Sequence, residues 1–152
     1  MIVGVISDTH GLLRPQALTA LEGSDLIIHA GDVGSPDILA RLRMIAPTIA
    51  VRGNVDTSPW GRTLAEVEVV EAEGHQIYVL HDVGALDLDP KAAGFSAVAY
   101  GHSHRPDAQM RHGVLFLNPG SAGPRRFSLP ISLARITIGS RGLTHEFVTL
   151  EA

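Results

Sequence analysis

Five apolar runs in this sequence each end at residues of types that bind metal ions. In chain order, the residues that follow the runs are Asp8 and His10, then Asp32, Asn54 and His81, and finally His102 and His104. Such runs predict strands, and in α/β proteins the strand ends at one edge of a sheet are where ligands and catalytic groups gather. We therefore expect these seven side chains to meet at one site.

The first third of the chain alternates between strand and helix patterns. Strands are expected at 2–7, 26–30 and 48–52, with helices near 15–22 and from 36 to about 46. Pro15 and Pro36 suit first helical positions, and Ser35 suits an N-cap. This βαβαβ order predicts parallel strands with helices on the faces of the sheet.

The second half of the chain has mostly strand patterns. Residues 66–71 alternate between charged and apolar side chains, and Gly74 separates them from the apolar run 76–81, so this pair predicts an antiparallel hairpin. Further strands are expected at 97–101, 107–111, 114–117, 131–138 and 143–149, with a short helical piece near 88–93. The simplest packing is two sheets face to face with helices outside, in one domain over residues 1–152.

Composition excludes several classes of function. The chain has no Cys, which rules out disulfides, thiolate metal sites and a Cys nucleophile. Its net charge of −4 and its scattered Arg residues argue against nucleic acid as a partner, but not against a small phosphorylated substrate. No apolar stretch approaches the roughly 20 residues of a membrane span, and the N-terminus lacks the basic start of a signal peptide. We expect a cytoplasmic protein without membrane contact, and leave a homo-oligomer open.

The types of the seven residues indicate which metals would bind. Imidazole and oxygen ligands without thiolate suit Mn, Fe, Co, Ni or Zn, whereas Mg and Ca prefer oxygen alone. The pairs Asp8/His10 and His102/His104 have i, i+2 spacing, which would point both members the same way in extended chain. Two ions about 3.5–4 Å apart can hold a bridging hydroxide and clamp a phosphoryl group in line.

The ordered motifs Asp-x-His, Gly-Asp, Gly-Asn, His and Gly-His-x-His resemble those of the calcineurin-like metallophosphoesterases, and the match continues in Asn118-Pro119-Gly120-Ser121. The chain is most similar to the small single-domain phosphodiesterase branch. The resemblance implies a four-layer α/β/β/α sandwich with a dinuclear centre, manganese being favoured. It implies one ion on Asp8, His10, Asp32 and His104, and a second on Asp32, Asn54, His81 and His102. Asp32 would bridge the ions, and the catalytic residues would be Asp32, Asn54, His102 and His104.

Two positions depart from the pattern of that family. Many relatives have a His after the Asn ligand that assists the leaving group, whereas this chain has Val55. Without that acid, good leaving groups should be favoured, which motivates a preference for diesters. The second departure is Asp82, directly after His81, where the small branch usually has Gly. Asp82 is expected to alter that loop or to add negative charge beside the second metal.

Residues near these motifs have alternative roles. We interpret His29 as a buried, hydrogen-bonded histidine, with support of the site as the alternative. Asp56 is expected either to pair with Arg52 or to orient a ligand, and Asn118 to Ser121 either to form only a turn or to offer backbone N–H groups to phosphate. For Trp60, loop packing and substrate stacking are both open. Arg14 and Arg105 are interpreted as surface residues, with phosphate binding as the alternative.

Two functions follow from this sequence. The leading hypothesis is a metal-dependent phosphodiesterase in which a hydroxide bridging two metal ions attacks phosphorus, while His102, His104 and the ions stabilise charge on the phosphoryl oxygens. The alternative is a protein-binding scaffold, because the retromer subunit of this superfamily has a similar small fold and a degraded site. All seven ligand positions here retain a competent side chain, which favours the enzyme.

Overall fold

Two mixed sheets of five strands each form the centre of the computed structural model, which describes residues 1–150. The first sheet has the order β10-β9-β1-β2-β3 and consists of β1 (Ile2–Ile6), β2 (Leu26–His29), β3 (Thr48–Ala50), β9 (Ser132–Gly139) and β10 (Gly142–Thr149). Strands β1, β2 and β3 are parallel, as the βαβαβ pattern predicts, and β9 runs antiparallel to β1.

The second sheet has the order β4-β5-β6-β8-β7. It consists of β4 (Val67–Ala72), β5 (His75–Leu80), β6 (Ala97–Ala99), β7 (Asp107–Arg111) and β8 (Val114–Asn118). Strands β5, β6 and β8 are parallel, and the edge strands β4 and β7 are antiparallel to their neighbours. The predicted hairpin is confirmed, because β4 and β5 pair across Glu73 and Gly74, both of which have positive φ.

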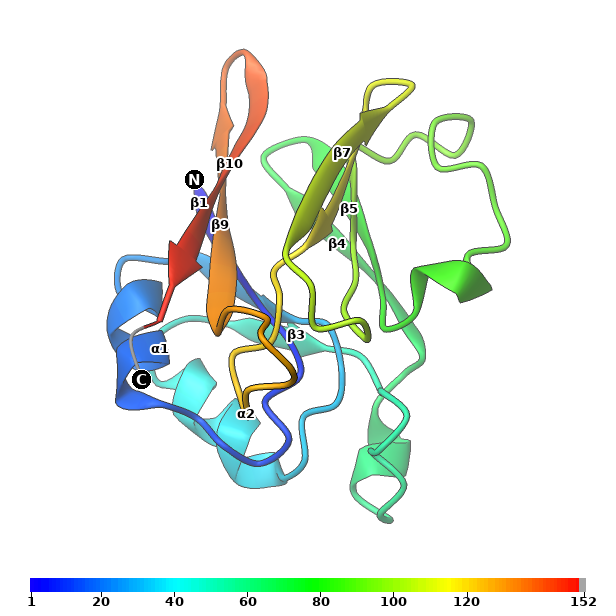
Figure 1. Cartoon of the computed structure of the whole chain (residues 1–152). Coiled ribbons are helices and arrows are strands. Elements are labelled where there is room, and N and C mark those ends of the chain that lie inside the picture. The colour runs from blue at the N-terminus through cyan, green and yellow to red at the C-terminus, as the bar shows by residue number, and fades with distance from the viewer. Residues whose placement is uncertain (151–152) are drawn as a thin grey trace.

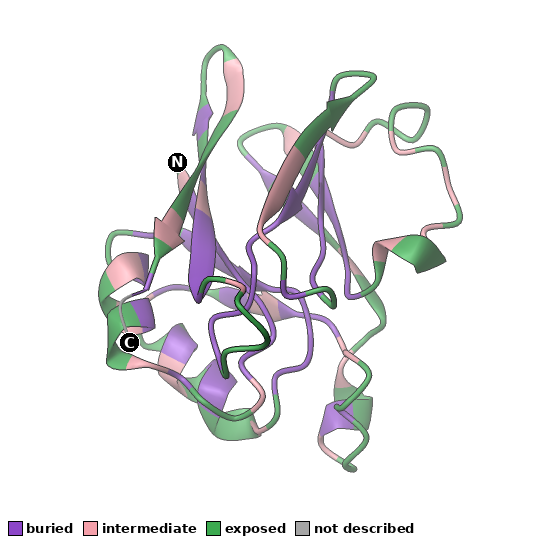
Figure 2. Cartoon of the chain, in the orientation of Figure 1, coloured by how far each residue is buried: buried purple, intermediate pink, exposed green. Residues whose placement is uncertain are grey.

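The two sheets lie face to face (Figure 1), and much of their inner strands is buried (Figure 2). Val5 and Ile28 of the first sheet are in one buried cluster with Ile77, Val79 and Leu117 of the second. Fully burying one such side chain stabilises the fold by roughly 1.5–3 kcal/mol, so this layer is a large contribution to stability. It also fixes the two sheets relative to each other, which matters because the predicted ligands come from both.

Two helices cover the outer face of the first sheet. α1 (Pro15–Leu21) and α2 (Pro36–Arg43) each begin at the predicted Pro, and their apolar faces pack with Ile6 and Ile27. Ser35 occupies the N-cap position of α2, but its side chain makes no capping hydrogen bond. The helix ends at Arg43, three residues before the predicted end at Ala46.

The outer face of the second sheet has a different cover. Tyr78, Val98 and Phe116 form an apolar cluster against which Leu86 and Phe95 pack. The loop that carries these two side chains contains the 3₁₀ turn η2 (Val83–Ala85). The predicted helical piece at 88–93 is wrong, because residues 90–94 form only hydrogen-bonded turns. Pro90 and Gly94, the latter with φ of 86°, enclose too few residues for an α-helix.

One further 3₁₀ turn, η1 (Gly61–Thr63), lies in the loop between β3 and β4. Across residues 1–150, no helix is both long enough and apolar enough to cross a membrane.

Candidate metal centre

All seven predicted ligands lie in loops that follow the carboxyl ends of parallel strands. Asp8 and His10 follow β1, Asp32 follows β2, and Asn54 follows β3, all in the first sheet; His81 follows β5, and His102 and His104 follow β6, both in the second. Parallel strands end at the same edge of their sheet, so each sheet collects its own ligands at one edge. The contacts described next show that these two edges meet.

Two carboxylates and three imidazoles converge on a small volume. The Nε2 atoms of His10, His81 and His104 lie 3.8, 3.9 and 3.4 Å from Oδ1 of Asp8. Oδ2 of Asp32 lies 3.6 Å from Nε2 of His10 and 3.2 Å from Nε2 of His81. Each carboxylate therefore lies between histidines from different loops, with Asp32 spanning the His10 and His81 sides.

Two sets of ligand atoms are close enough to hold a metal ion. Asp8, His10 and His104 form one set, and Asp8, Asp32 and His81 form the other, with all ligand atoms of a set within 4.8 Å of one another. Oδ1 of Asp8 and Nε2 of His10 and of His81 are buried and have no hydrogen-bond partner. Buried polar atoms are rarely left unpaired, so these atoms fit metal coordination.

The remaining carboxylate oxygens are held by hydrogen bonds. Oδ2 of Asp8 accepts from the Ser7 hydroxyl at 2.7 Å and from the His102 backbone N–H at 3.2 Å. Oδ1 of Asp32 accepts from the Val55 backbone N–H at 3.0 Å. Each carboxylate is thus oriented by one oxygen while its other oxygen faces the histidines.

The charged groups of the centre shift each other's pKa values. Burial would raise the pKa of Asp8, but the nearby imidazoles of His10, His104 and His81 outweigh burial and lower it. Burial likewise would raise the pKa of Asp32, but His81 and the Val55 N–H lower it. The carboxylates in turn raise the pKa of His10 and, against the effect of burial, that of His81. Both carboxylates are therefore ionised at neutral pH and ready to bind a cation.

Five of the seven predicted ligands have left-handed backbone conformations. Their φ values are 56° at Asp8, 48° at His10, 55° at Asp32, 76° at His102 and 63° at His104. The expectation that the two i, i+2 pairs lie in extended chain is therefore wrong, since both pairs follow the strand ends in tight loops. Strained non-glycine backbone of this kind is concentrated at functional sites, where the surrounding structure holds it in place.

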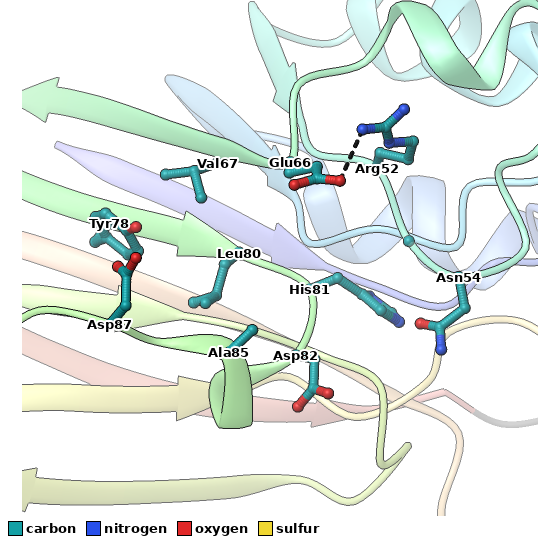
Figure 3. Close-up of a pocket in the computed structure, with 11 residues that line it drawn as sticks. Arg52, Asn54, Glu66, Val67, Tyr78, Leu80, His81, Asp82, Ala85 and Asp87 are labelled. Carbon is teal, nitrogen blue, oxygen red and sulfur yellow. Dashed lines mark hydrogen bonds and ion pairs between the residues drawn. The ribbon is translucent and has the colours of Figure 1, made fainter.

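Asn54 and His102 are more exposed than the other predicted ligands. The His102 ring lies 5.3 Å from the His81 ring, and Asn54 lines a cavity together with His81 (Figure 3). The structure thus places both residues beside His81, on the open side of the centre.

Asp56 connects two of the ligand loops. Its buried carboxylate accepts backbone N–H groups of Val33, Gly34 and Gly53 at 2.9 to 3.2 Å. It therefore fixes the loop after Asp32 to the loop that carries Asn54. The alternative partner, Arg52, pairs instead with Glu66.

His29 is buried, as predicted, and connects the loop after β1 to the loop after β2. The Thr9 hydroxyl donates to the Val33 carbonyl, so its oxygen is left to accept from Nε2 of His29 at 3.0 Å. Nδ1 of His29 accepts from the Gly31 N–H. Burial lowers the pKa of His29 to about 4, so the ring is neutral at neutral pH.

The segment Asn118 to Ser121 supports the centre. The Asn118 amide donates to the Gly101 carbonyl and to the Ser103 hydroxyl, which holds the loop of His102 and His104. The Ser121 hydroxyl donates to the Asp8 carbonyl. Sequence reasoning missed these bonds and that of Ser7, because they join residues far apart in the chain or give no pattern of their own.

Two glycines permit the close approach of loops. A Cβ added at Gly53 would overlap the Asp32 carboxylate, and one added at Gly101 would overlap the Ser7 hydroxyl. The Gly-Asn and Gly-His motifs therefore have a packing reason as well as a role in the turn.

Four residues near the motifs had two possible roles in the sequence, and the structure shows their contacts. Trp60 packs against the helix-side core, so the loop-packing interpretation holds. Arg14 donates to the Gly123 carbonyl, and Arg105 is exposed. Asp82 accepts from the Gly84 N–H and lines the cavity in Figure 3. Arg126, which the sequence did not single out, lies near enough to His10 to lower its pKa, against the larger effect of Asp8.

Comparison with known proteins identifies the family. A model of the calcineurin-like phosphoesterase superfamily domain matches residues 1–141. The chain belongs to this superfamily. This calcineurin-like phosphoesterase is 34% identical over 142 residues to a probable metallophosphoesterase of Methanothermobacter thermautotrophicus, covering 86% of this chain and 82% of that protein. It is 27% identical to the phosphodiesterase YfcE of Escherichia coli, covering 83% of this chain and 82% of YfcE.

The superfamily fold is also found in Vps29. A structure of Vps29 from Entamoeba histolytica, complexed with Zn²⁺, superposes with a TM-score of 0.75 and 24% identity over 98% of this chain and 99% of that one. This likeness shows the fold alone. The choice between an enzyme and a scaffold therefore depends on the side chains of the centre.

Proposed function

We propose that this calcineurin-like phosphoesterase is a metal-dependent hydrolase of phosphate esters that prefers diesters to monoesters. One observation carries the proposal. Nε2 of His10 and Nε2 of His81 each lie within 3.9 Å of Oδ1 of Asp8, and all three atoms are buried without a hydrogen bond. The family match and the names of the relatives support the same activity.

Two divalent ions would share the seven ligands. Asp8, His10 and His104 would hold one ion, Asn54, His81 and His102 would hold the other, and Asp32 would contact both. The mixed imidazole and oxygen set suits a first-row transition metal, and manganese is the first candidate to test. When bound, the ions supply an acidified water molecule and neutralise charge on the phosphoryl group.

The chain's own residues then set the reaction geometry. Asp32 is oriented by the Val55 N–H, so its free oxygen stays directed at the histidines. Exposed His102, beside His81, would contact a phosphoryl oxygen of a substrate. Asn54, on the same open side, contributes a neutral amide that adds no negative charge against an anionic substrate.

Val55 limits which leaving groups can depart. Its side chain is 49% exposed and has no proton to donate. In hydrolysis a new P–O bond forms to water, the P–O bond to the alcohol breaks, and the alcohol oxygen must gain a proton from solvent. Without a general acid, esters of acidic alcohols should react faster than esters of simple alkyl alcohols.

Bis-p-nitrophenyl phosphate tests this function. Chelator-treated protein should be inactive, and added Mn²⁺ or another candidate metal should restore hydrolysis. p-Nitrophenyl phosphate, the monoester, should be hydrolysed more slowly. Failure of Mn²⁺, Fe²⁺, Co²⁺, Ni²⁺ and Zn²⁺ alike to restore hydrolysis would refute the proposal.

The scaffold alternative has weaker support. It expects a contiguous exposed apolar patch, and the large exposed apolar side chains among residues 1–150 are scattered along the sequence, including Met44, Val69, Met110 and Phe127. A protein that only binds partners would also not require seven competent ligands.

A further inference from the structure

A cavity opens beside the metal centre on the side of the exposed ligands. It has a volume of about 430 Å³; Asn54 and His81 lie at one end, and Tyr78 and Asp87 at the other (Figure 3). His81 is only 5% exposed, and its Nε2 has no hydrogen-bond partner. An ester whose phosphorus reacts at the centre must place an alcohol group next to it, and this cavity is adjacent and large enough.

The charges that line the cavity are mostly negative. Arg52 is the one Arg or Lys that lines it, and its guanidinium pairs with Glu66 at 2.9 Å, which offsets both charges. Asp82 and Asp87 remain, and within the part of the chain that the structure describes neither has an ion-pair partner. A ligand in the cavity therefore meets two uncompensated carboxylates.

The walls between these charges are apolar. Leu80 and Ala85 line the middle of the cavity, and Tyr78 closes it beside Asp87. Asp87 lies near enough to the Tyr78 hydroxyl to add to the effect of burial in raising the pKa of Tyr78. Methylene and methyl groups suit such walls, and an aromatic ring beside a carboxylate is a common environment for an organic ammonium group.

We propose that this cavity receives an alcohol group of the substrate and selects an alcohol that carries a positive charge, so that the preferred substrates are phosphodiesters of amino alcohols. The inference rests on the proposed function, which it extends to substrate class. A second phosphate group in the cavity would face Asp82 and Asp87 and be repelled, so nucleoside polyphosphates are disfavoured.

Two esters with the same leaving group test the proposal. p-Nitrophenyl phosphorylcholine carries a quaternary ammonium group, and p-nitrophenyl 3,3-dimethylbutyl phosphate replaces that nitrogen by carbon with nearly the same shape. Both release p-nitrophenol, so a difference in kcat/KM reports the charge alone. The metal-loaded enzyme should prefer the choline ester by about tenfold, the size expected of two solvent-facing charge contacts.

Substitution of the two cavity carboxylates tests whether the cavity causes the preference for the choline ester. Asp87→Asn should reduce it to about threefold, and Asp82→Asn with Asp87→Asn should remove it. Asp87→Asn is informative even if the double variant folds poorly, because it leaves the Asp82 cap on Gly84 intact. Glu71→Gln is the matched control, since it removes the same charge from an exposed position outside the cavity and should leave the preference unchanged.

The outcomes separate this inference from the function it rests on. Equal hydrolysis of the two esters by the wild-type enzyme, or a preference that survives the substitution of both carboxylates, overturns the inference and leaves the phosphodiesterase standing. If no candidate metal supports hydrolysis of either ester or of bis-p-nitrophenyl phosphate, the proposed function fails and the inference fails with it.

Discussion

The two halves of the proposed metal centre differ in how firmly the fold holds them. On one side, Asp8 and His104 are almost fully buried, and the His10 side chain is 19% exposed. On the other side, Asn54 and His102 are exposed, and Asn54 lines a cavity. The first half resembles a preformed ion site, whereas the second is open to whatever enters the cavity.

Buried side chains hold the loops of both halves, so the difference lies in the ligands themselves. The loop of His10 is held to the loop after β2 through the Thr9 and His29 side chains, both buried. The loop of Asn54 is held by the carboxylate of Asp56, while the Asn54 side chain itself faces the cavity. We therefore expect one ion to bind tightly and in a fixed position, and the other to bind more weakly and closer to substrate.

The largest predicted effect comes from the one residue assigned to both halves. Asp32→Asn keeps the shape of the side chain but removes the charge shared by the two ions, so kcat/KM for bis-p-nitrophenyl phosphate should fall by at least about 1000-fold. Glu71→Gln, which removes one exposed carboxylate far from the centre, should leave the rate unchanged. Full activity of Asp32→Asn with metal present would refute the role of this residue.

Asp56→Ala should have the largest effect on stability. It leaves three backbone N–H groups without an acceptor, and their loss should lower the free energy of unfolding by about 3 kcal/mol. Urea denaturation of the metal-free protein measures this change. A loss below about 0.5 kcal/mol would show that Asp56 does not join the two loops in the way described.

His29 makes the stability of the buried half dependent on pH. Its folded-state pKa of about 4 lies below the ordinary value, so the unfolded chain binds more protons in the window between about 6.5 and 4. The contribution is complete above pH 6.5 and is lost as the pH falls, by about 2 kcal/mol at pH 5. Denaturation of wild type and His29→Asn at pH 7 and pH 5 should show this difference. A parallel pH response of the two proteins would contradict it.

The smallest predicted effect is a change in metal affinity, and it distinguishes the two halves of the centre. Asn54→Ala removes one neutral ligand from the open half, so the metal concentration needed for half-maximal activity should rise by about tenfold, while the tighter ion still binds. His10→Ala should instead weaken the tighter ion. If both variants weaken the same ion, the division into two halves is wrong.

Much of the fold and the centre could be predicted from the sequence, because both depend on local patterns. Apolar runs and the alternating pattern at 66–71 predicted the strands, and Pro15 and Pro36 marked the starts of both helices. The helix predicted at 88–93 is absent because Pro90 and Gly94 allow only turns. Spacing along the chain also could not predict the left-handed backbone conformations in the loops after the strands.

The side chains that support the centre were harder to predict than the ligands. Ligands such as Asp8 and His104 belong to short motifs with characteristic spacing. Asp56 accepts from the backbone of Val33 and Gly34, and Asn118 donates to the Gly101 carbonyl and the Ser103 hydroxyl. These partners are 15 or more residues away, and no local pattern indicates such bonds. Their roles follow only from the pairing of strands that brings the loops together.

Calorimetric titration of the metal-free protein with Mn²⁺ tests the central claim most directly. The account predicts two ions per chain, the first bound more tightly than the second, with hydrolysis of bis-p-nitrophenyl phosphate appearing as the second site fills. Binding of no ion, or full activity with a single ion per chain, would contradict it.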